Sequence, residues 1–424
     1  MSDLRLGIDI GTSGIRSAVL APDGAVLSSA RAAHLPQPDP DHIDAEAWWQ
    51  ATCTCLAAQA TALAEIGLDL REVGRIGVDG TSGTMVLTDA ALRPVTRALM
   101  YNSTGFEAEA TRIAAACPGP HIAKGSNSAL ARALCLQGED TDQRAVHLLH
   151  QADFIAARLL GRGGISDENN TLKLGFDPET GAWPEWFAET GLRLDLLPQV
   201  LPAGARIDQI APEMAATLGL SPNTVIHAGT TDSIAAFLAA APLAPGAAVT
   251  SLGTTLALKI LSPARVDAPE LGLYSHKVGD VWLVGGASNT GGGVLASLFS
   301  PEELTALSAR IDPTRPSDLD YYPLLKPGER FPVNDPALAP RMTPRPEDDA
   351  VFLHGLLDSI ARIEARGYAA IAAHGGPQPT QLYTAGGGAR NPVWTQIRAR
   401  CLGLEIRDAG DCEASVGIAR LIGT

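Results

Sequence analysis

The sequence has little positive charge. Its 32 Lys and Arg residues stand against 47 Asp and Glu residues, which gives a formal net charge of −15. Binding to nucleic-acid phosphates requires clustered Lys and Arg side chains, so we expect no nucleic-acid partner. A small anionic ligand remains compatible with this charge, because backbone amides and a metal ion can bind it.

Long apolar runs and a targeting segment are also lacking. No stretch reaches the roughly 18 uninterrupted apolar residues of a membrane-spanning helix, and no basic segment followed by an apolar one stands at the N-terminus. The six cysteines are scattered without a second pair at zinc-ligand spacing, which favours free thiols. These absences predict a cytoplasmic protein without a membrane partner.

Two common nucleotide-binding motifs are missing. There is no G-x-x-x-x-G-K-[ST] loop, and no G-x-G-x-x-G lies between a strand and a helix. A hydrolase is disfavoured, because the chain has no nucleophile elbow or metal triad. A nucleotide site in this chain therefore needs another way of holding phosphate.

The chain does have a pattern of strands and helices that resets near residue 240. Its 424 residues are enough for two or three domains. Three consecutive strands are predicted at the N-terminus as an antiparallel meander, Leu4–Ile10, Ile15–Leu20 and Ala25–Arg31. We also predict a helix over Ala145–Leu160, a polar loop over Ser166–Phe176, and a long ordered loop or insertion over 312–347. The restarting pattern favours two α/β domains with a cleft between them.

A Gly-Thr pair directly follows a predicted strand at four places, which are Gly11-Thr12, Gly80-Thr81, Gly229-Thr230 and Gly253-Thr254. Glycine allows a tight turn and close approach of a ligand to the backbone. The exposed amides and hydroxyls of such a turn can hold phosphate without a lysine. A single Gly-Thr turn is ordinary loop chemistry, but four of them favour phosphate and sugar binding.

Two acidic residues accompany these turns. Asp9 lies inside an apolar strand, where a carboxylate is costly unless it is paired or faces a ligand, and Asp232 ends Gly229-Thr-Thr-Asp232. Each has a structural alternative, because Asp9 can be a hydrogen-bonded strand carboxylate and Asp232 a helix N-cap. Together they match phosphoryl transfer, which uses one carboxylate near a metal and one to accept the hydroxyl proton.

Three segments resemble motifs of the FGGY carbohydrate kinases, which share the actin–hexokinase–Hsp70 fold. They are Gly7–Gly14 and Ser251–Thr255, similar to the two phosphate motifs, and Leu382–Trp394, similar to the adenosine motif. The resemblance covers nearly the whole chain. It implies an α/β protein of two actin/hexokinase-like (ribonuclease H-like) domains, with a sugar-binding domain over 1–239, a nucleotide-binding domain over 240–410, and a C-terminal helix over 411–424 that packs back on the first domain.

The resemblance also implies residue roles. Asp232 would be the catalytic base, Asp9 would position Mg²⁺ through water, and Thr12 would hold phosphate. The residues implied for ATP binding are Gly11, Thr12, Ser13, Gly253, Thr254, Thr255, Gly292, Gly387, Gly388, Asn391 and Trp394.

The segment Asp79–Thr84 stands where typical xylulokinases have Gln-Met-His-Gly. It resembles instead the short D-ribulokinase or xylulose kinase-like group of plants and cyanobacteria, as do Gly229–Phe237 and Leu319–Pro323. D-ribulose is the substrate that this resemblance implies. The implied sugar contacts are Asp9, Ser13, Ser82, Asp232 and Ser233.

The sequence is also compatible with other functions. The nearest is a kinase of the same family that acts on xylulose, ribitol or glycerol. One of a different class is an actin-like regulatory protein that binds ATP without transferring it, and the acid at Asp232 argues against it. The expected partners are a small sugar and ATP, in a monomer or a homodimer.

Overall fold

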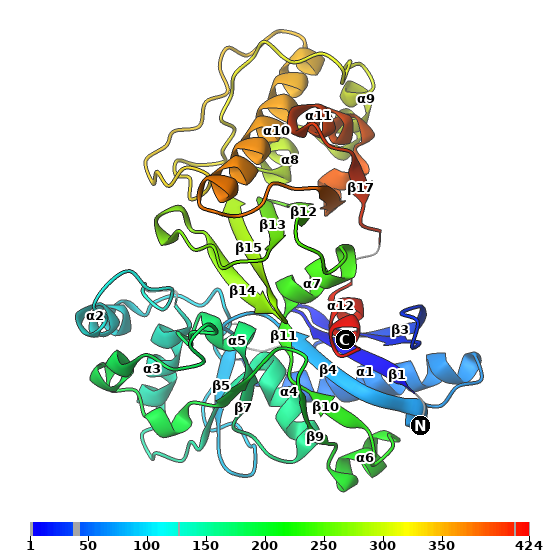
Figure 1. Cartoon of the computed structure of the whole chain (residues 1–424), viewed down its shortest axis with the longest axis vertical. Coiled ribbons are helices and arrows are strands. Elements are labelled where there is room, and N and C mark those ends of the chain that lie inside the picture. Colours follow the sequence, from blue (N-terminus) through cyan, green and yellow to red (C-terminus); the bar gives the residue numbers. More distant parts are fainter. Residues whose placement is uncertain (1–2, 37–42, 126–127, 411–412, 424) are drawn as a thin grey trace. The chain divides into compact units, whose positions relative to one another are not determined.

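The computed structural model describes residues 3–36, 43–125, 128–410 and 413–423. The chain forms two compact units, Met1–Ala239 with Cys412–Thr424 (unit 1) and Ala240–Asp411 (unit 2). Unit 2 is thus inserted between two segments of unit 1, as the colours along the chain show (Figure 1). None of the helices in the described ranges has the length and hydropathy needed to cross a lipid bilayer.

Unit 1 is built on a mixed sheet of order β3-β2-β1-β4-β10-β9, with β11 also paired to β4. The first three strands form the predicted antiparallel meander, and β4 and β10 run parallel to β1. The strands of unit 1 are β1 Leu4–Ile10, β2 Gly14–Leu20, β3 Val26–Ala33, β4 Val73–Gly80, β5 Met85–Thr88, β6 His147–His150, β7 Ile165–Asp167, β8 Gln199–Leu201, β9 Arg206–Gln209, β10 Val225–His227 and β11 Thr230–Thr231.

Helices cover both faces of this sheet. Alternate residues of β1 (Leu4, Leu6, Ile8 and Ile10) pack with α1 and α4 in the main core of the unit. The helices of unit 1 are α1 Glu46–Glu65, α2 Glu107–Ala116, α3 Ala129–Glu139, α4 Gln151–Leu160, α5 Glu168–Leu172, α6 Pro212–Leu218, α7 Asp232–Ala240 and α12 Ala414–Leu421, with short 3₁₀ turns η1 Leu70–Glu72, η2 Glu185–Thr190 and η3 Leu194–Leu196.

The opposite face of the sheet is shaped by two glycines. A Cβ atom at Gly7 would lie 1.9 Å from the carbonyl oxygen of Ser415, and one at Gly77 would lie 2.8 Å from Cγ1 of Ile418. Both contacts are with α12, so only glycine at these positions lets the helix lie this close to β1 and β4. The next residues on the same face are two further along each strand, because side chains alternate.

Unit 2 contains a second mixed sheet of order β14-β15-β13-β12-β16-β17. Its antiparallel part is β14-β15-β13-β12, and β16 and β17 continue parallel to β12. The strands are β12 Ala247–Leu252, β13 Leu256–Ser262, β14 Tyr274–Val278, β15 Val281–Ser288, β16 Gln381–Ala385 and β17 Ile406–Asp408.

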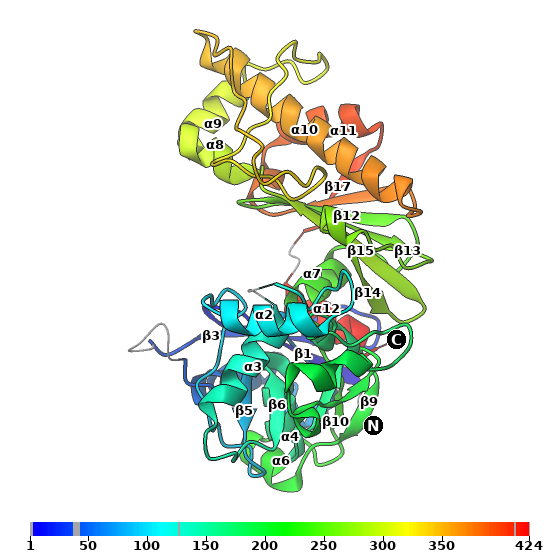
Figure 2. The same ribbon diagram turned by 90° about the vertical axis from the view of Figure 1, so that its left-hand side faces the viewer.

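The long helix α10 crosses one face of the second sheet beside α11 (Figure 2). Its buried residues form one cluster with the sheet residues Leu258 and Ile260 and with Trp394 of α11. The helices of unit 2 are α8 Gly292–Leu298, α9 Pro301–Ser308, α10 Asp349–Ala373 and α11 Pro392–Leu402, with 3₁₀ turns η4 Pro269–Leu271 and η5 Gly387–Arg390. Between α9 and α10 the chain runs without helix or strand and keeps only isolated β-bridges, as predicted for 312–347.

Three predicted local structures are wrong. The helix predicted over Ala145–Leu160 begins only at Gln151, because His147–His150 pairs with β5 as strand β6. The polar loop predicted over Ser166–Phe176 contains strand β7 and the buried helix α5. The turn predicted at Gly229-Thr230 is not a turn, because Thr230 and Thr231 form strand β11 beside β4.

Candidate active site

Two aspartates lie side by side at the end of the first sheet. Asp9 of β1 is in register with Asp79 of β4, and with Arg16 of β2 on its other side. Arg16 Nη1 lies 3.1 Å from Asp9 Oδ2. Asp9 and Asp79 follow Gly7 and Gly77 on the face covered by α12, so the same alternation that seats the helix puts both carboxyl groups just beyond it.

The local electrostatics oppose ionisation of both groups. Burial raises the pKa of Asp9 above its usual range, although the hydrogen bond and charge of Arg16 lower it. The pKa of Asp79 is raised much further, first by burial and then by the charges of Asp9 and Asp232. Asp79 is fully buried, and neither of its carboxylate oxygens has a hydrogen-bond partner of normal geometry among the described residues. Unit 1 therefore gathers acidic groups at the ends of its central strands and disfavours their ionisation.

Asp232 lies near Asp9 and Asp79, directly after strand β11. Strand β11 pairs with β4 so that Thr230 lies beside Asp79, and helix α7 begins two residues later at Asp232. Asp232 is partly exposed, and its Oδ1 accepts a hydrogen bond of 2.6 Å from the Ser233 amide. A partly exposed carboxylate beside two buried ones is a suitable proton acceptor for a hydroxyl group.

A buried amide network holds β11 in place. Asn169 Nδ2 donates to Thr230 Oγ1 at 3.0 Å, and Asn170 Nδ2 donates to the Thr230 carbonyl at 3.1 Å. Asp167 caps this short helix by accepting from the amides of both asparagines at 2.9 Å. Burial and the charge of Asp153 raise the pKa of Asp167 to about 6. The segment predicted as a polar loop is thus the support for the strand that leads to Asp232.

The turn after β1 exposes the predicted phosphate-binding groups. Thr12 and Ser13 are exposed, and the turn closes with a 3.0 Å hydrogen bond from the Gly11 amide to the Gly14 carbonyl. His34 anchors the turn from the end of β3, because its amide donates to the Ser13 carbonyl at 3.1 Å and its Nε2 lies 2.9 Å from the Gly11 carbonyl. The role of His34 had no signal in the sequence.

The turn after β4 is buried rather than open. Gln151 Oε1 accepts from both the amide and the hydroxyl of Thr81, at 3.0 and 2.7 Å, and Arg132 Nε donates to the Gly83 carbonyl at 2.8 Å. Ser82 is partly exposed, but its Oγ is buried without a hydrogen-bond partner in the described part of the chain. An unused hydroxyl of this kind is available to a ligand that reaches it.

In unit 2 the predicted nucleotide residues lie together where strands β12 and β16 of the second sheet end. Parallel pairing puts Ser251 of β12 beside Ala385 of β16, so the segments that follow them, Gly253–Thr255 and Gly386–Gly388, lie at neighbouring strand ends. Gly292 joins them by donating its amide to the Gly253 carbonyl at 2.9 Å. Three glycine-containing segments that are distant in the sequence therefore lie close together within unit 2.

Gly387 lies open, and a Cβ atom there would meet nothing within 4 Å. Gly388 is tightly packed, because a Cβ atom there would lie 2.6 Å from the ring of Trp394. Trp394 is buried in the core beneath this segment. Asn391 caps α11 by accepting from the amides of Val393 and Trp394, both at 3.1 Å, and donates to Ser308 Oγ at 2.8 Å. The side chains of Trp394 and Asn391 therefore support the Gly386–Gly388 segment from its inner side.

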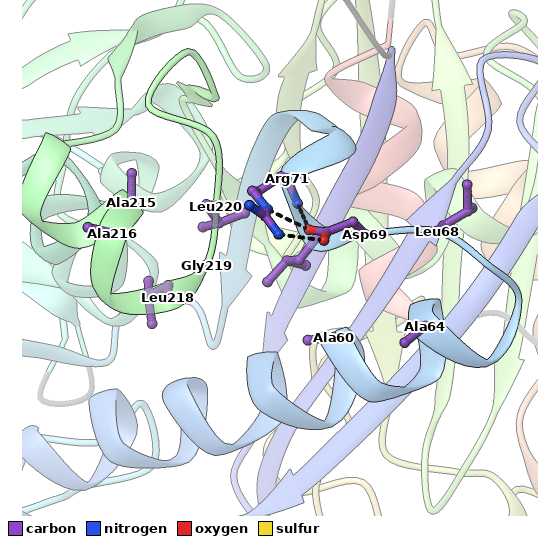
Figure 3. Close-up of a pocket in the computed structure, with 11 residues that line it drawn as sticks. Ala60, Ala64, Leu68, Asp69, Arg71, Ala215, Ala216, Leu218, Gly219 and Leu220 are labelled. Atoms are coloured by element: carbon purple, nitrogen blue, oxygen red, sulfur yellow. Dashed lines mark hydrogen bonds and ion pairs between the residues drawn. The ribbon is translucent and has the colours of Figure 1, made fainter.

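A surface hollow of about 440 Å³ also occurs in unit 1, between the end of α1, η1 and α6 (Figure 3). Alanines and leucines line most of it. Its charged groups are Asp69 and Arg71, which form an ion pair of 3.0 Å with each other. It adjoins the start of β4, whereas Asp79 lies at the other end of that strand. We therefore place the candidate active site at the aspartates and not in this hollow.

The structure thus brings Asp9, Asp232 and the Gly11–Gly14 turn together in unit 1, and the remaining predicted nucleotide residues together in unit 2. Sequence reasoning missed Asp79. A signal for it was present, because Gly77-Val-Asp79 repeats the pattern of Gly7-Ile-Asp9, and both are followed by Gly-Thr-Ser-Gly after at most one further residue.

Comparison with known proteins gives a consistent result. Residues 4–239 match the N-terminal domain of the FGGY family of carbohydrate kinases, and residues 248–423 match its C-terminal domain. A xylulose kinase of Escherichia coli (strain K12) is 25% identical over 450 residues, which cover 98% of this chain and 89% of that protein. An autoinducer-2 kinase of Yersinia enterocolitica is 24% identical over 455 residues, which cover 96% of this chain and 83% of that protein.

Two solved structures show the same fold. A xylulose kinase from Rhodospirillum rubrum superposes with a TM-score of 0.84 at 22% identity, covering 99% of this chain and 89% of that one. A Plasmodium falciparum glycerol kinase with ADP gives a TM-score of 0.85 at 17% identity, again covering 99% and 89%. The predicted actin-like α/β fold class is thereby confirmed.

Proposed function

Because this chain belongs to the FGGY family of carbohydrate kinases, we propose that it transfers the γ-phosphoryl group of ATP to a hydroxyl of D-ribulose, forming D-ribulose 5-phosphate. The observation that carries this proposal is the grouping of Asp9, Asp79 and Asp232 at the strand ends of unit 1, beside the exposed Gly11–Gly14 turn. Phosphoryl transfer depends mainly on positioning and charge neutralisation, and these groups offer both.

In this proposal Asp232 accepts the proton of the attacking hydroxyl. It is the partly exposed member of the three, and the amide network around Thr230 fixes the strand that leads to it. Ser13, Ser82 and Ser233 would contact the sugar. The hydroxyl of Ser82 is buried and has no hydrogen-bond partner among the described residues. The turn amides and hydroxyls at Gly11–Ser13 would hold phosphate oxygens as their charge develops.

Asp9 would hold Mg²⁺ through water. The charges of Asp9 and Asp232 raise the pKa of Asp79, and a bound cation would relieve this repulsion. In the described ranges no group of three or more His, Cys, Asp or Glu side chains is arranged to hold a metal ion directly. Water-mediated binding by one carboxylate together with substrate phosphates is the usual mode of Mg²⁺. When bound, Mg²⁺ neutralises charge on the β- and γ-phosphates.

Unit 2 would bind the nucleotide. Gly253, Thr254 and Thr255 would hold phosphates, Gly292 would support them, and Gly387 and Gly388 would carry the adenosine, with Asn391 and Trp394 fixing that segment from below. Trp394→Ala should weaken ATP binding, because the Gly388 backbone rests on its ring. Equal ATP affinities of variant and wild type in calorimetry would count against this support.

D-xylulose is the second candidate, and the names of the matched relatives favour it. The choice of D-ribulose rests on Asp79–Thr84, which resembles the D-ribulokinase-like group and presents Ser82 near the aspartates.

A coupled ADP-release assay with MgATP tests the proposal, using D-ribulose, D-xylulose, ribitol, glycerol and no acceptor, with the product identified by mass and NMR. We expect the largest kcat/KM for D-ribulose and phosphate on its terminal hydroxyl. A larger kcat/KM for D-xylulose would move the assignment to the second candidate. ADP release without any phosphorylated sugar would support an ATP-binding regulator instead.

A further inference from the structure

The segment between α9 and α10 contributes one buried carboxylate to unit 2. Glu329 is 2% exposed and lies in a region without helix or strand. Its Oε2 accepts from Ser288 Oγ at 2.6 Å and from Tyr322 Oη at 2.9 Å, and its Oε1 accepts from the Asn289 amide at 2.7 Å and the Arg330 amide at 2.9 Å. A buried carboxylate with this many donors is strongly held.

A chain of hydrogen bonds runs from Glu329 to the predicted phosphate-binding turn. Ser288 Oγ, which donates to Glu329, accepts from the Thr290 amide at 3.1 Å. The Thr290 carbonyl accepts from the Leu256 amide at 2.7 Å, directly after the turn. The chain then continues through two glycines, because the amides of Gly292 and Gly293 donate to the carbonyls of Gly253 and Thr254 at 2.9 and 3.0 Å.

The turn needs this external support. Its one internal backbone bond, from the Gly253 amide to the Thr255 carbonyl, is 3.2 Å long. The neighbouring segment is packed tightly against it, since a Cβ atom at Gly291 would lie 2.7 Å from the carbonyl carbon of Thr255. Gly291 has φ 145°, which L side chains rarely adopt. The position of the turn is therefore set by residues 288–293, which Glu329 holds.

We propose that Glu329 is a positioning residue for nucleotide binding, which acts through Ser288 and Thr290 on the Gly253–Thr255 turn that holds the ATP phosphates. This inference rests on the proposed function of that turn. It gives a role to the otherwise unassigned Leu319–Pro323 motif, because Tyr322 of that motif binds the same carboxylate. Tyr322, however, is not part of the chain of hydrogen bonds that runs from Glu329 through Ser288 and Thr290 to the turn.

That difference provides a matched pair of variants. Ser288→Ala and Tyr322→Phe each remove one buried hydroxyl bonded to Glu329 Oε2, but only Ser288→Ala breaks the path to the turn. Both should lower the melting temperature by a similar amount. Only Ser288→Ala should weaken ATP binding, by about tenfold if one charge-assisted hydrogen bond of the path is lost.

The measurement is calorimetric titration of the full chain with MgATP in the absence of sugar, followed by KM and kcat for both substrates. We expect Ser288→Ala to raise the dissociation constant and KM of ATP and to leave the KM of the sugar unchanged. Glu329→Gln should shift ATP binding in the same direction, and Glu347→Gln, an exposed acid of the same segment, should match wild type.

Two results would overturn the inference. One is an unchanged ATP affinity in Ser288→Ala and Glu329→Gln. The other is equal weakening in Ser288→Ala and Tyr322→Phe, which would indicate general loosening of the core. If wild type itself binds no ATP, the proposed function fails and the inference fails with it, whereas wild-type binding with unaffected variants overturns the inference alone.

Discussion

The two sheets of this protein share an arrangement but end in different side chains. The order β3-β2-β1-β4-β10 in unit 1 repeats as β15-β13-β12-β16-β17 in unit 2, with the same sequence of antiparallel and parallel pairs. At matching positions two residues before each Gly-Thr turn, unit 1 has Asp9 and unit 2 has Ser251. Their register partners are Asp79 and Ala385.

The different side chains suit the two sheets to different tasks. Carboxylates at the strand ends can attract a cation and can accept a proton. The chemical step requires both. Small neutral residues followed by glycine leave room for a polyphosphate and do not repel its charge. We therefore infer that chemistry belongs to the acidic end of unit 1 and nucleotide binding to the neutral end of unit 2.

Buried acids outside these strand ends differ in a similar way. In unit 2, Glu364 is fully buried and receives two hydrogen bonds, of 2.6 and 2.8 Å, from the Arg398 guanidinium. In unit 1, Asp167 is equally buried but accepts only from backbone amides and the Asn170 side chain in the described structure. A guanidinium thus compensates the buried Glu364 of unit 2, whereas the donors to the buried Asp167 of unit 1 in the described structure are neutral.

Removing the proton acceptor of unit 1 should have the largest effect on activity. Asp232→Asn should lower kcat by about 10²–10⁴-fold, the usual contribution of a general base. ATP affinity in calorimetry should stay at the wild-type value, because Asp232 is not among the residues proposed to bind the nucleotide. Asp142→Asn, an exposed acid of unit 1, is the control. Wild-type turnover by Asp232→Asn would refute the assignment of the base.

The second-largest effect is expected when Asp9 of unit 1 is replaced by serine, the residue at the matching position of unit 2. Asp9→Ser places the residue found at 251 into β1 and removes the negative charge beside Arg16. We expect kcat to fall by about 10²–10³-fold, as for loss of one charge-stabilising group, and the magnesium concentration for half-maximal rate to rise. An unchanged magnesium titration would show that Asp9 has no metal role.

The buried acid Asp167 should also make the stability of the protein depend on pH. The pKa of Asp167 is raised from 3.8 to about 6, so the folded state binds its proton more tightly than the unfolded state does. Its contribution is therefore fully present below pH 4 and is lost as the pH rises through 6. With about 1.4 kcal/mol for each pKa unit, the change is roughly 2–3 kcal/mol.

Urea denaturation of wild type and Asp167→Asn between pH 4 and pH 8 measures this effect. The difference in unfolding free energy between the two proteins should change with pH up to about pH 6–7, in the direction that disfavours wild type. It should then level off. A difference that is constant across this range would show that Asp167 keeps an ordinary pKa.

The reverse exchange should have the smallest effect. Ser251→Asp puts an acid at the strand end of unit 2, where we expect it to repel the ATP phosphates and weaken ATP binding by about tenfold. Ser251→Asn, similar in size but neutral, is the matched control. If both variants bind ATP equally, charge at this position is irrelevant to the nucleotide.

Much of the fold followed from local patterns. The period-two alternation of Leu4–Ile10 and the glycine turns gave the meander of β1, β2 and β3, because these strands pair with chain neighbours. Strand β6 was missed since His147–His150 is fixed by pairing with the distant β5. Alanine-rich helical propensity after it masked this long-range contact.

The residues of the candidate site could be predicted where they belong to a sequence motif. They could not be predicted where only contacts with distant parts of the chain place them. Asp9 and Asp232 were identifiable because each accompanies a Gly-Thr pair. Asp167 and Asn170 looked like surface loop residues, since their polarity gives no sign that they satisfy one another inside the protein. Glu329 gave no signal either, because its partner Ser288 lies 41 residues away in the chain.

The helix α12 has a consequence for how the protein is made. It packs on β1 through Gly7 and touches α7 so closely that a Cβ atom at Gly417 would lie 1.7 Å from the Ala235 carbonyl oxygen. Arg420 also donates to the carbonyls of Leu238 and Ala239 at the end of α7, whose first residue is Asp232. The ribosome synthesises all of unit 2 before it reaches this helix. A nascent chain therefore carries unit 1 with the flanks of β1 and α7 uncovered until translation has passed residue 421.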